Sequence, residues 1–369
     1  MAHIEKRGPK RYRARYRGPD GVERSKTFER RVDAERWLDR LRGDLARGLY
    51  VDPEAGRQLF KDYAAAWRET QLHRDLTKAL LDSVIPRHVL PFFGDRPLGS
   101  VRPSEIQGWV KDRAEVLAPA SVEIAYGVVA AVFRAAVADR LIPASPCSGI
   151  KRPSRVRSQL HQDQILTTDE VLALVASVPE RYRALVLIGA GAGLRSGEAL
   201  GLTEARVEFL RRQLRIDHQL ITAPRRDPYL GPPKTQASNR IIPVPDAVIK
   251  ALAAHRERYR PGPWGLLFTS EQDAPIRRQN FGRIWRVAVG RAGVVRGTRF
   301  HDLRHYYASL LIRHGESVKV VQARLGHASA AETLDTYSHL WPDSEERTRQ
   351  AVQEAFTGPL AAASVGGSA

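Results

Sequence analysis

The sequence predicts a mainly α-helical, multi-domain protein with small β elements. Three observations support this fold class. A length of 369 residues exceeds a comfortable single core, one N-terminal stretch alternates with period two, and apolar residues recur at helical spacing over much of the rest. We expect a small β-sheet-plus-helix module at 1–55, a helical domain at 58–150 and a mixed α+β domain at 162–358. The small-residue tail at 359–369 is expected to be flexible.

The stretch "KRYRARYRGPDGVERSKTFE" predicts a β-hairpin, because "GPDG" is a turn signal between two extended runs. Tyr12, Ala14 and Tyr16 alternate onto one face of its first strand. The opposite face carries a row of four arginines: Arg11, Arg13, Arg15 and Arg17. Such a row either follows a track of DNA phosphates or protects a solvated edge strand, and we favour DNA. Leu38 and Leu41 belong to the helix expected next, which Gly48 would end.

Residues 58–150 are expected to be helical throughout, with apolar stripes that form a core. One stripe repeats at i, i+4 and i+8 through Leu59, Tyr63 and Trp67. A second stripe runs through Val122, Tyr126, Val129, Phe133 and Val137. Pro103 suits the first turn of a helix. We interpret these residues as packing, with nothing catalytic among them.

Charge and cysteine content narrow the class of partner. The chain has 59 Lys+Arg against 41 Asp+Glu, a formal net charge of +18, spread along its whole length. Nucleic acid is the expected polyanion, ahead of a membrane surface. A single cysteine excludes an internal disulfide and indicates a reducing compartment. No secretory signal is evident and no run approaches the length of a membrane span, so we expect a cytoplasmic, DNA-associated protein.

The third region follows a basic, Pro- and Ser-containing linker at 142–160. Thr168 is the expected N-cap of its first helix, and a buried helix that follows should break at Gly191 and Gly193. The runs "RRQLRIDHQLITA" and "SNRIIPVP" predict strands on either side of a loop. From about residue 299 to 354 the chain should return to helix.

Two stretches of this region place charged groups in apolar surroundings. In "GAGLRSGEALGL", Arg195 needs a partner because burying it unpaired is costly, and Glu198 could supply a simple buried salt bridge. In "RFHDLRHYYASLL", His301 and Arg304 are neighbours at i and i+3 on one helix face. An arginine depresses the proton affinity of a nearby histidine, so this pairing makes sense if an anion binds between them.

Two further stretches add a lysine and a tyrosine. Lys234, in what reads as a hairpin turn, is either an ordinary loop lysine or a proton donor, since lysine can change protonation state and arginine cannot. "LGHASAAETLDTYSH" places His327 ten residues before Tyr337, on a turn and a short helix. Tyr337 is one of 11 tyrosines, and core packing is its default interpretation until partners are found.

Arg195, Lys234, "HDLR", "LGH" and Tyr337, in this order, resemble the tyrosine recombinase (phage integrase) family, of the large arm-binding integrase type. The resemblance covers 162–358, with all six catalytic positions filled, and extends more weakly upstream. It implies that 58–150 is a core-DNA-binding domain and that 1–55 resembles an arm-site DNA-binding module.

The resemblance implies strand cleavage by Tyr337 through a 3′-phosphotyrosyl link, with Arg195 and Arg304 clamping the phosphate. It also implies that His301 is the base, that His327 donates to the phosphate and that Lys234 protonates the departing 5′ oxygen. Glu198 would orient the residues around Arg195. The bond energy is conserved in the link, so we expect no ATP, metal or other cofactor.

The implied function is integration of phage or mobile-element DNA into a host chromosome through a Holliday junction. The implied partners are double-stranded DNA, three further copies in a tetramer, and a host DNA-bending protein and an excisionase. Lys151 and Arg152 join the N-terminal arginines as candidate DNA contacts. His305 and His314 are interpreted as solvent or packing histidines. The alternatives are a catalytically silent DNA-binding remnant, and a resolvase or type IB topoisomerase-like enzyme with the same tyrosine chemistry.

Overall fold

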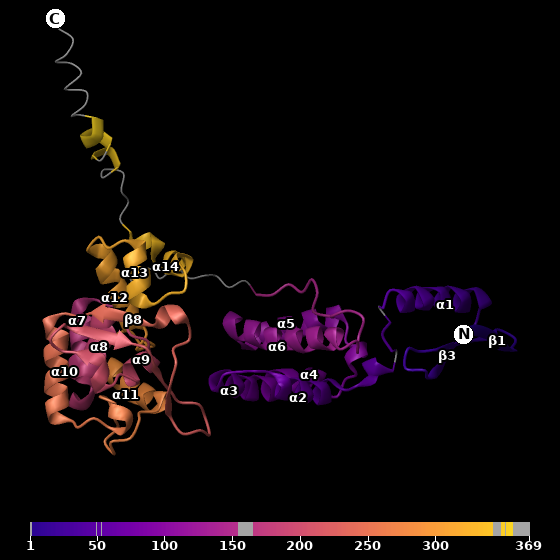
Figure 1. Cartoon of the computed structure of the whole chain (residues 1–369), viewed down its shortest axis with the longest axis horizontal. Coiled ribbons are helices and arrows are strands. Elements are labelled where there is room, and N and C mark those ends of the chain that lie inside the picture. The colour runs from indigo at the N-terminus through magenta and orange to yellow at the C-terminus, as the bar shows by residue number, and fades with distance from the viewer. Residues whose placement is uncertain are drawn as a thin grey trace, which may run out of the picture. The chain divides into compact units, whose positions relative to one another are not determined.

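The computed structural model describes residues 2–48, 50–52, 54–153, 165–341, 348–350 and 352–356. The chain forms two compact units, Met1–Val156 and Arg157–Ala369 (Figure 1). Helices dominate and the sheets are small, so the predicted fold class is confirmed. Three predicted segments lie outside the described residues. They are the tail at 359–369, the second half of the linker, and both ends of the expected third domain.

The N-terminal residues form a three-stranded antiparallel sheet covered by one helix. Its elements are β1 (His3–Gly8), β2 (Arg11–Arg17), β3 (Glu23–Phe28) and α1 (Arg31–Ala46). The predicted hairpin is β2 with β3, and β1 pairs with the other edge of β2. Strand β1 was not predicted, because "HIEKRG" has no regular alternation of apolar and polar residues. Ala14 and Tyr16 are buried against Leu38 and Leu41 of α1, as their spacing predicted.

The expected helical region is confirmed as helical up to Ala138, whereas residues 139–150 form turns and bends in place of the expected helix. It contains α2 (Phe60–Thr70), α3 (Asp75–Val84), a π-helical turn (Ile85–Val89), α4 (Leu90–Phe93), α5 (Pro103–Val116) and α6 (Pro119–Ala138). Pro103 is the first residue of α5, where its missing N–H costs no hydrogen bond. Val122, Val129 and Phe133 are fully buried, so this stripe of α6 forms core as predicted.

Helix α6 corrects one expectation from the sequence. Its 20 residues, with a mean hydropathy of 1.6 over the best window, are long and apolar enough to cross a membrane by length and composition alone. The prediction that no run approaches this length was therefore wrong. The helix packs against α2, α3 and α5, and its buried residues belong to the core of these helices. The helix is apolar because it consists largely of alanines and valines, and several of these residues pack in the core.

The second unit is built around one buried helix. Its helices are α7 (Thr168–Ser177), α8 (Arg183–Ala192), α9 (Ser196–Leu200), α10 (Asp246–Arg258), α11 (Arg278–Arg291), α12 (Asp302–Arg313), α13 (Val318–Leu325) and α14 (Ala330–Tyr337). Helix α8 contacts α7, α10 and α12 (Figure 1). Leu185 and Ile188 of α8 are fully buried in this core. The predicted return to helix after residue 299 is confirmed for α12 to α14.

Short strands lie beside these helices. One sheet has the order β4 (Val207–Glu208), β5 (Gln213–Ile216), β8 (Arg240–Pro243), and a separate hairpin joins β6 (Gln219–Ile221) to β7 (Tyr229–Gly231). A 3-10 turn, Gln236–Ser238, precedes β8. The strands predicted in "RRQLRIDHQLITA" and "SNRIIPVP" are confirmed as β5, β6 and β8.

Two local predictions in this unit were wrong by one or two positions. Thr167, not Thr168, caps α7, because its side chain and Glu170 complete a reciprocal capping box. The hydroxyl of Thr168 instead lies 3.0 Å from that of Tyr306. Gly191 lies inside α8, close to Val248, and the helix ends only at Gly193, whose φ is +62°.

Candidate functional site

A left-handed glycine brings α8, α9 and α12 together at the candidate site. Gly193 has a φ of +62°, and a Cβ built on it would lie 2.5 Å from Cδ1 of Tyr307 on α12. Any other residue would therefore be strained and would collide with α12. The close approach places Arg195, two residues later, at the N-cap of α9 and beside the end of α13.

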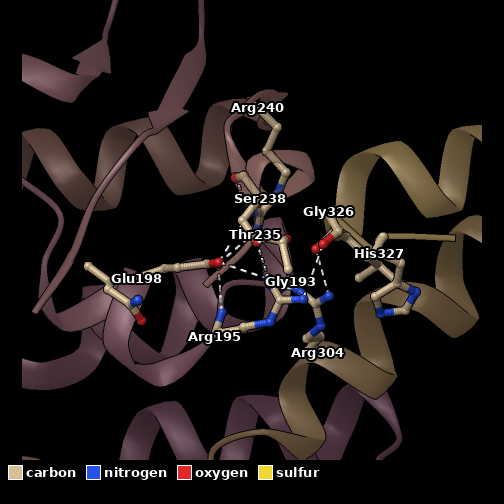
Figure 2. Close-up of polar contacts among 12 residues, drawn as sticks. Gly193, Arg195, Glu198, Thr235, Ser238, Arg240, Arg304, Gly326 and His327 are labelled. Atoms are coloured by element: carbon tan, nitrogen blue, oxygen red, sulfur yellow. Dashed lines mark hydrogen bonds and ion pairs between the residues drawn. The ribbon is translucent and has the colours of Figure 1, made fainter. Parts of the chain in front are cut away.

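Arg195 is held by Glu198, the partner that sequence analysis predicted. The Glu198 carboxylate accepts hydrogen bonds from the backbone N–H and from Nη1 of Arg195, both at 3.0 Å. The other Arg195 contacts are to Ser238 Oγ and to the Gly326 carbonyl, each at 3.2 Å (Figure 2). Arg195 thus joins α9, the turn before β8 and the end of α13 at one guanidinium.

Arg240 is a further partner of Glu198 that sequence analysis missed. Its Nη2 and Nη1 lie 2.8 and 3.2 Å from the two carboxylate oxygens of Glu198 (Figure 2). It also donates to the carbonyls of Ser238 and Arg324. Side chains alternate between the two faces of β8, so Arg240 lies on the same face as buried Ile242. This alternation could have identified Arg240 from the sequence.

The Glu198 carboxylate is ionised despite its burial. Its side chain is only 2% exposed. Burial raises its pKa, but the hydrogen bond from Arg240 and the charges of Arg240 and Arg195 outweigh this, so the pKa lies below its usual range. A buried anion shared by two arginines therefore fixes both of their positions.

Arg304 is the largest fully buried side chain of the described residues, at 1% exposure. Nη1 donates to the Gly193 carbonyl at 2.8 Å and Nη2 to the Leu325 carbonyl at 2.6 Å. Burial, together with the nearby charges of Arg195 and Arg240, lowers its pKa to about 9, although the charge of Glu198 opposes this change. The site therefore holds more positive charge than its one carboxylate balances.

His301 and His327 lie in the field of these arginines and stay neutral. His301 is the N-cap residue of α12, and burial together with Arg304 lowers its pKa to about 4. His327 follows the left-handed Gly326 at the end of α13, and burial with the charges of Arg304 and Arg195 lowers its pKa to about 3. Its Nδ1 lies 2.8 Å from Thr333 Oγ1, which fixes the ring plane.

Tyr337 ends α14 with its side chain in the core of the unit, at 1% exposure. Its hydroxyl lies 2.7 Å from Nδ1 of His305, which is itself buried. Burial raises the tyrosine pKa above its usual value, although Arg304 opposes the rise. His305 is buried, in line with its interpretation as a packing histidine, but its contact with Tyr337 was not predicted. It is four residues after His301 on α12, so helical periodicity could have placed both rings on one face.

Lys234 lies outside this cluster of side chains. It is exposed in the loop between β7 and the turn before β8. The expected hairpin turn was wrong, because β7 and β8 belong to different sheets. The loop is nevertheless tied to the site, since Thr235 Oγ1 lies 3.0 Å from Ser238 Oγ, which accepts from Arg195.

The candidate DNA contacts differ in how far their charges are already paired. On β2, Arg11 and Arg17 are exposed, while Arg15 pairs with Glu5 at 3.4 Å and with Glu23 at 3.1 Å. Arg13 donates to Ser25 Oγ on β3. Lys151 is exposed, whereas Arg152 pairs with Glu123 at 3.0 Å and lies over the Tyr126 ring.

The geometry suits an anion with oxygens on several sides. Arg195 and Arg240 pair with the single carboxylate of Glu198, and the guanidinium of Arg304 lies next to that of Arg195 (Figure 2). Guanidinium forks match phosphate oxygens in geometry and charge. The charge of Arg304 acts on the phenol of Tyr337 and opposes the rise in its pKa. Together they could bind a phosphodiester and present a phenol to it.

Two family models match the chain. The model described as "Phage integrase family" matches residues 164–343, and that described as "Phage integrase, N-terminal domain" matches residues 3–47. A protein named as the prophage phiRv2 integrase of Mycobacterium tuberculosis is 31% identical over 351 residues, which cover 89% of this chain and 88% of that protein. The integrase of Mycobacterium phage D29 is 26% identical over 337 residues, covering 85% and 84%.

Solved structures share the fold. The Tn1549 transposon integrase, in complex with a circular intermediate DNA, aligns with a TM-score of 0.67 at 20% identity, over 81% of this chain and 99% of that one. A lambda integrase dimer bound to a COC′ core site aligns with a TM-score of 0.60 at 18% identity, over 93% and 95%.

Proposed function

Since the chain belongs to the phage integrase family of tyrosine recombinases, we propose that it is a site-specific DNA recombinase that integrates phage or mobile-element DNA into a host chromosome. The observation that carries the proposal is the gathering of three arginines near one buried carboxylate, with Tyr337 in the same core. A site with three arginines and one carboxylate is stable with a bound phosphodiester and poorly compensated without one.

In this proposal Tyr337 attacks the scissile phosphorus in line with the departing 5′ oxygen, and His301 takes the phenol proton. The P–O bond to the tyrosine forms as the P–O5′ bond breaks, leaving a 3′-phosphotyrosyl link and a free 5′ hydroxyl. Arg195 and Arg304 stabilise the negative charge that grows on the non-bridging oxygens. Lys234, on its exposed loop, protonates the 5′ oxygen, and His327 donates a hydrogen bond to the phosphate. The link conserves the bond energy, so rejoining to another strand needs no ATP.

Glu198 and Arg240 act by holding Arg195. Because Arg195 also donates to the Gly326 carbonyl, its position is coupled to the turn that carries His327. The buried position of Tyr337 has a consequence for the reaction. At 1% exposure its hydroxyl cannot reach DNA, so α14 must shift when the core site binds.

The remaining regions supply DNA binding. We propose that 1–55 binds arm-type sites, 58–150 binds the core site and 162–358 cuts it. The family match over 3–47 supports the first assignment, and separate hydrophobic cores in 2–50, 60–150 and 166–341 support the division. On β2, Arg11 and Arg17 are exposed and form no ion pair with another described residue, so they are better phosphate contacts than Arg15, which pairs with two glutamates. A tetramer, a host DNA-bending protein and an excisionase complete the proposed assembly.

The test is a covalent trapping experiment. The protein is incubated with a nicked duplex that carries the core site, and the mixture is denatured. We expect a covalent protein–DNA species with the wild type. The control variant Tyr306→Phe should form it too, because the Tyr306 hydroxyl contacts Thr168. Tyr337→Phe should form none. A wild type that binds but forms no adduct would indicate a silent DNA-binding remnant, and supercoil relaxation without strand exchange would indicate a topoisomerase-like enzyme.

A further inference from the structure

We propose that Gln219 and Ser238 are positioning residues that hold the two ends of the Lys234 loop against α9. The Lys234 loop is the segment 232–235, between β7 and the turn before β8. This inference rests on the proposed function, in which a proton moves from the Lys234 ammonium to the 5′ oxygen as the P–O5′ bond breaks. The observation behind it is two side-chain ties, one before and one after Lys234, that both lead to α9.

The first tie is the side-chain amide of Gln219 on β6. Its Nε2 donates to the Pro232 carbonyl at 3.0 Å, two residues before Lys234. Gln219 pairs with Gly231 in the β6–β7 hairpin, so its amide meets the chain where it leaves β7. Pro232 and Pro233 both have a ring-fixed φ, so few backbone angles can vary between this tie and Lys234.

Close packing of β6 on α9 carries the first tie to the helix. Gly197 lies in α9 and Gly201 at its end, four residues apart and therefore on one face. A Cβ built on Gly201 would lie 2.4 Å from the backbone nitrogen of Leu220. One built on Gly197 would lie 3.2 Å from Oε1 of Gln219. The two glycines thus let β6, with Gln219, lie directly against the helix that begins after Arg195.

The second tie runs through two hydroxyl groups to the Arg195 guanidinium. Thr235 Oγ1 lies 3.0 Å from Ser238 Oγ, which accepts from Nη1 of Arg195 at 3.2 Å (Figure 2). The backbone N–H of Ser238 also donates to the Thr235 carbonyl at 3.1 Å. Ser238 is only 1% exposed, so solvent does not compete for its hydroxyl. The residue directly after Lys234 is therefore joined to one of the two arginines that clamp the phosphate in the proposed reaction.

The two ties leave Lys234 as an exposed residue between two anchored points. A proton donor on a freely moving loop would be within reach of the 5′ oxygen for only part of the time. With both ends held on α9, the donor and Arg195 keep one relative position, and this kind of orientation contributes to rate. Neither Gln219 nor Ser238 needs to touch DNA for this effect.

The experiment compares two nicked core-site duplexes that differ in one atom. One has the natural 5′ oxygen at the scissile bond, and the other has sulfur in its place. A thiol is much more acidic than an alcohol, so the sulfur leaves as a thiolate without taking a proton. The rate of adduct formation is measured in single turnover at saturating protein. A defect in the proton donor is therefore corrected by sulfur, whereas a defect in the phosphate clamp is not.

Gln219→Met tests the first tie, because it removes the amide and keeps the length of the side chain. We expect it to lose roughly 10- to 100-fold in rate with the oxygen duplex. With the sulfur duplex its rate should equal that of the wild type, which would also show that the variant is folded. Gln236→Met is the matched control, since Gln236 is exposed in the next turn and its side chain forms no hydrogen bond with another described residue. It should match the wild type with both duplexes.

Two more variants complete the comparison. Lys234→Met should lose roughly 10²- to 10⁴-fold with the oxygen duplex and recover with sulfur. Ser238→Ala should be slow with both duplexes but slower with oxygen, because Ser238 contacts Arg195 as well as the Lys234 loop.

Three results would overturn the proposal. They are a Gln219→Met rate equal to that of Gln236→Met with the oxygen duplex, a Gln219→Met defect of the same size with both duplexes, and no recovery of Lys234→Met with sulfur. Adduct formation by Tyr337→Phe is a different failure. It would remove the nucleophile itself and with it the proposed function.

Discussion

Replacing Arg240 with methionine should strongly destabilise the second unit, although sequence analysis did not identify this residue. Methionine keeps much of the length of the side chain and removes its charge. The change deletes the hydrogen bonds of Arg240 to Glu198, to the Ser238 carbonyl and to the Arg324 carbonyl. Glu198 would remain in the core with Arg195 as its remaining guanidinium partner.

The expected cost follows from the burial of the pair. The side chains of Arg240 and Glu198 are 5% and 2% exposed. Removing one partner of a buried ion pair typically costs about 3–5 kcal/mol, because the other charge is left poorly compensated. The surface pair of Arg212 and Asp246 is a matched control, with a contact of similar length, 2.9 Å, but with side chains 61% and 63% exposed. Arg212→Met should have little effect on stability, because solvent screens an ion pair between exposed side chains.

Native-state hydrogen exchange in the full chain measures the local loss of stability. It is followed by mass spectrometry on peptides from α8 and α12. A local method suits a chain with several cores, whose global unfolding need not be a single transition. The expected free-energy loss corresponds to exchange faster by roughly 10²- to 10⁴-fold for Arg240→Met, and by less than about tenfold for Arg212→Met. Equal effects of the two substitutions would refute the conclusion that Arg240 stabilises the buried charge of Glu198.

Two further predictions concern pH and the N-terminal module. The pKa values of His301, His305 and His327 lie well below the ordinary value of 6.5. Between these values the unfolded chain binds protons that the folded chain does not. The free energy of unfolding should therefore be highest above about pH 6.5 and should fall as the pH is lowered toward 4. Urea unfolding of the second unit at pH 7 and pH 5 checks this, and equal stability at both would contradict it. Deleting residues 1–55 should spare core-site cleavage but abolish integration, and unchanged integration efficiency would exclude an arm-binding role.

The sequence was informative wherever a residue and its partner lie close along the chain. Arg195 with Glu198, and His301 with Arg304, are separated by one helical turn, so spacing alone predicted that each pair shares a face. The period-two pattern around Tyr16 and the stripe through Phe133 likewise identified buried faces correctly. These are local regularities, set by helix and strand geometry.

Contacts that depend on tertiary structure were the ones missed. Arg240 meets Glu198 only because β8 lies beside α9, 42 residues apart in sequence. The pairing of Arg15 with Glu5 needed the register between β1 and β2, and β1 itself was not predicted. His305 was assigned a packing role because its position after Arg304 does not reveal that α14 returns to it 32 residues later.

The most direct test of the account is to identify the residue that becomes joined to DNA. The trapped adduct is digested with nuclease and trypsin, and the nucleotide-bearing peptide is sequenced by mass spectrometry. Cleavage after Arg324 and Arg347 releases residues 325–347, in which Tyr337 is the single tyrosine. The account predicts a nucleotide on Tyr337 in this peptide. A nucleotide on Tyr306, Tyr307 or any other residue, with this peptide unmodified, would contradict it.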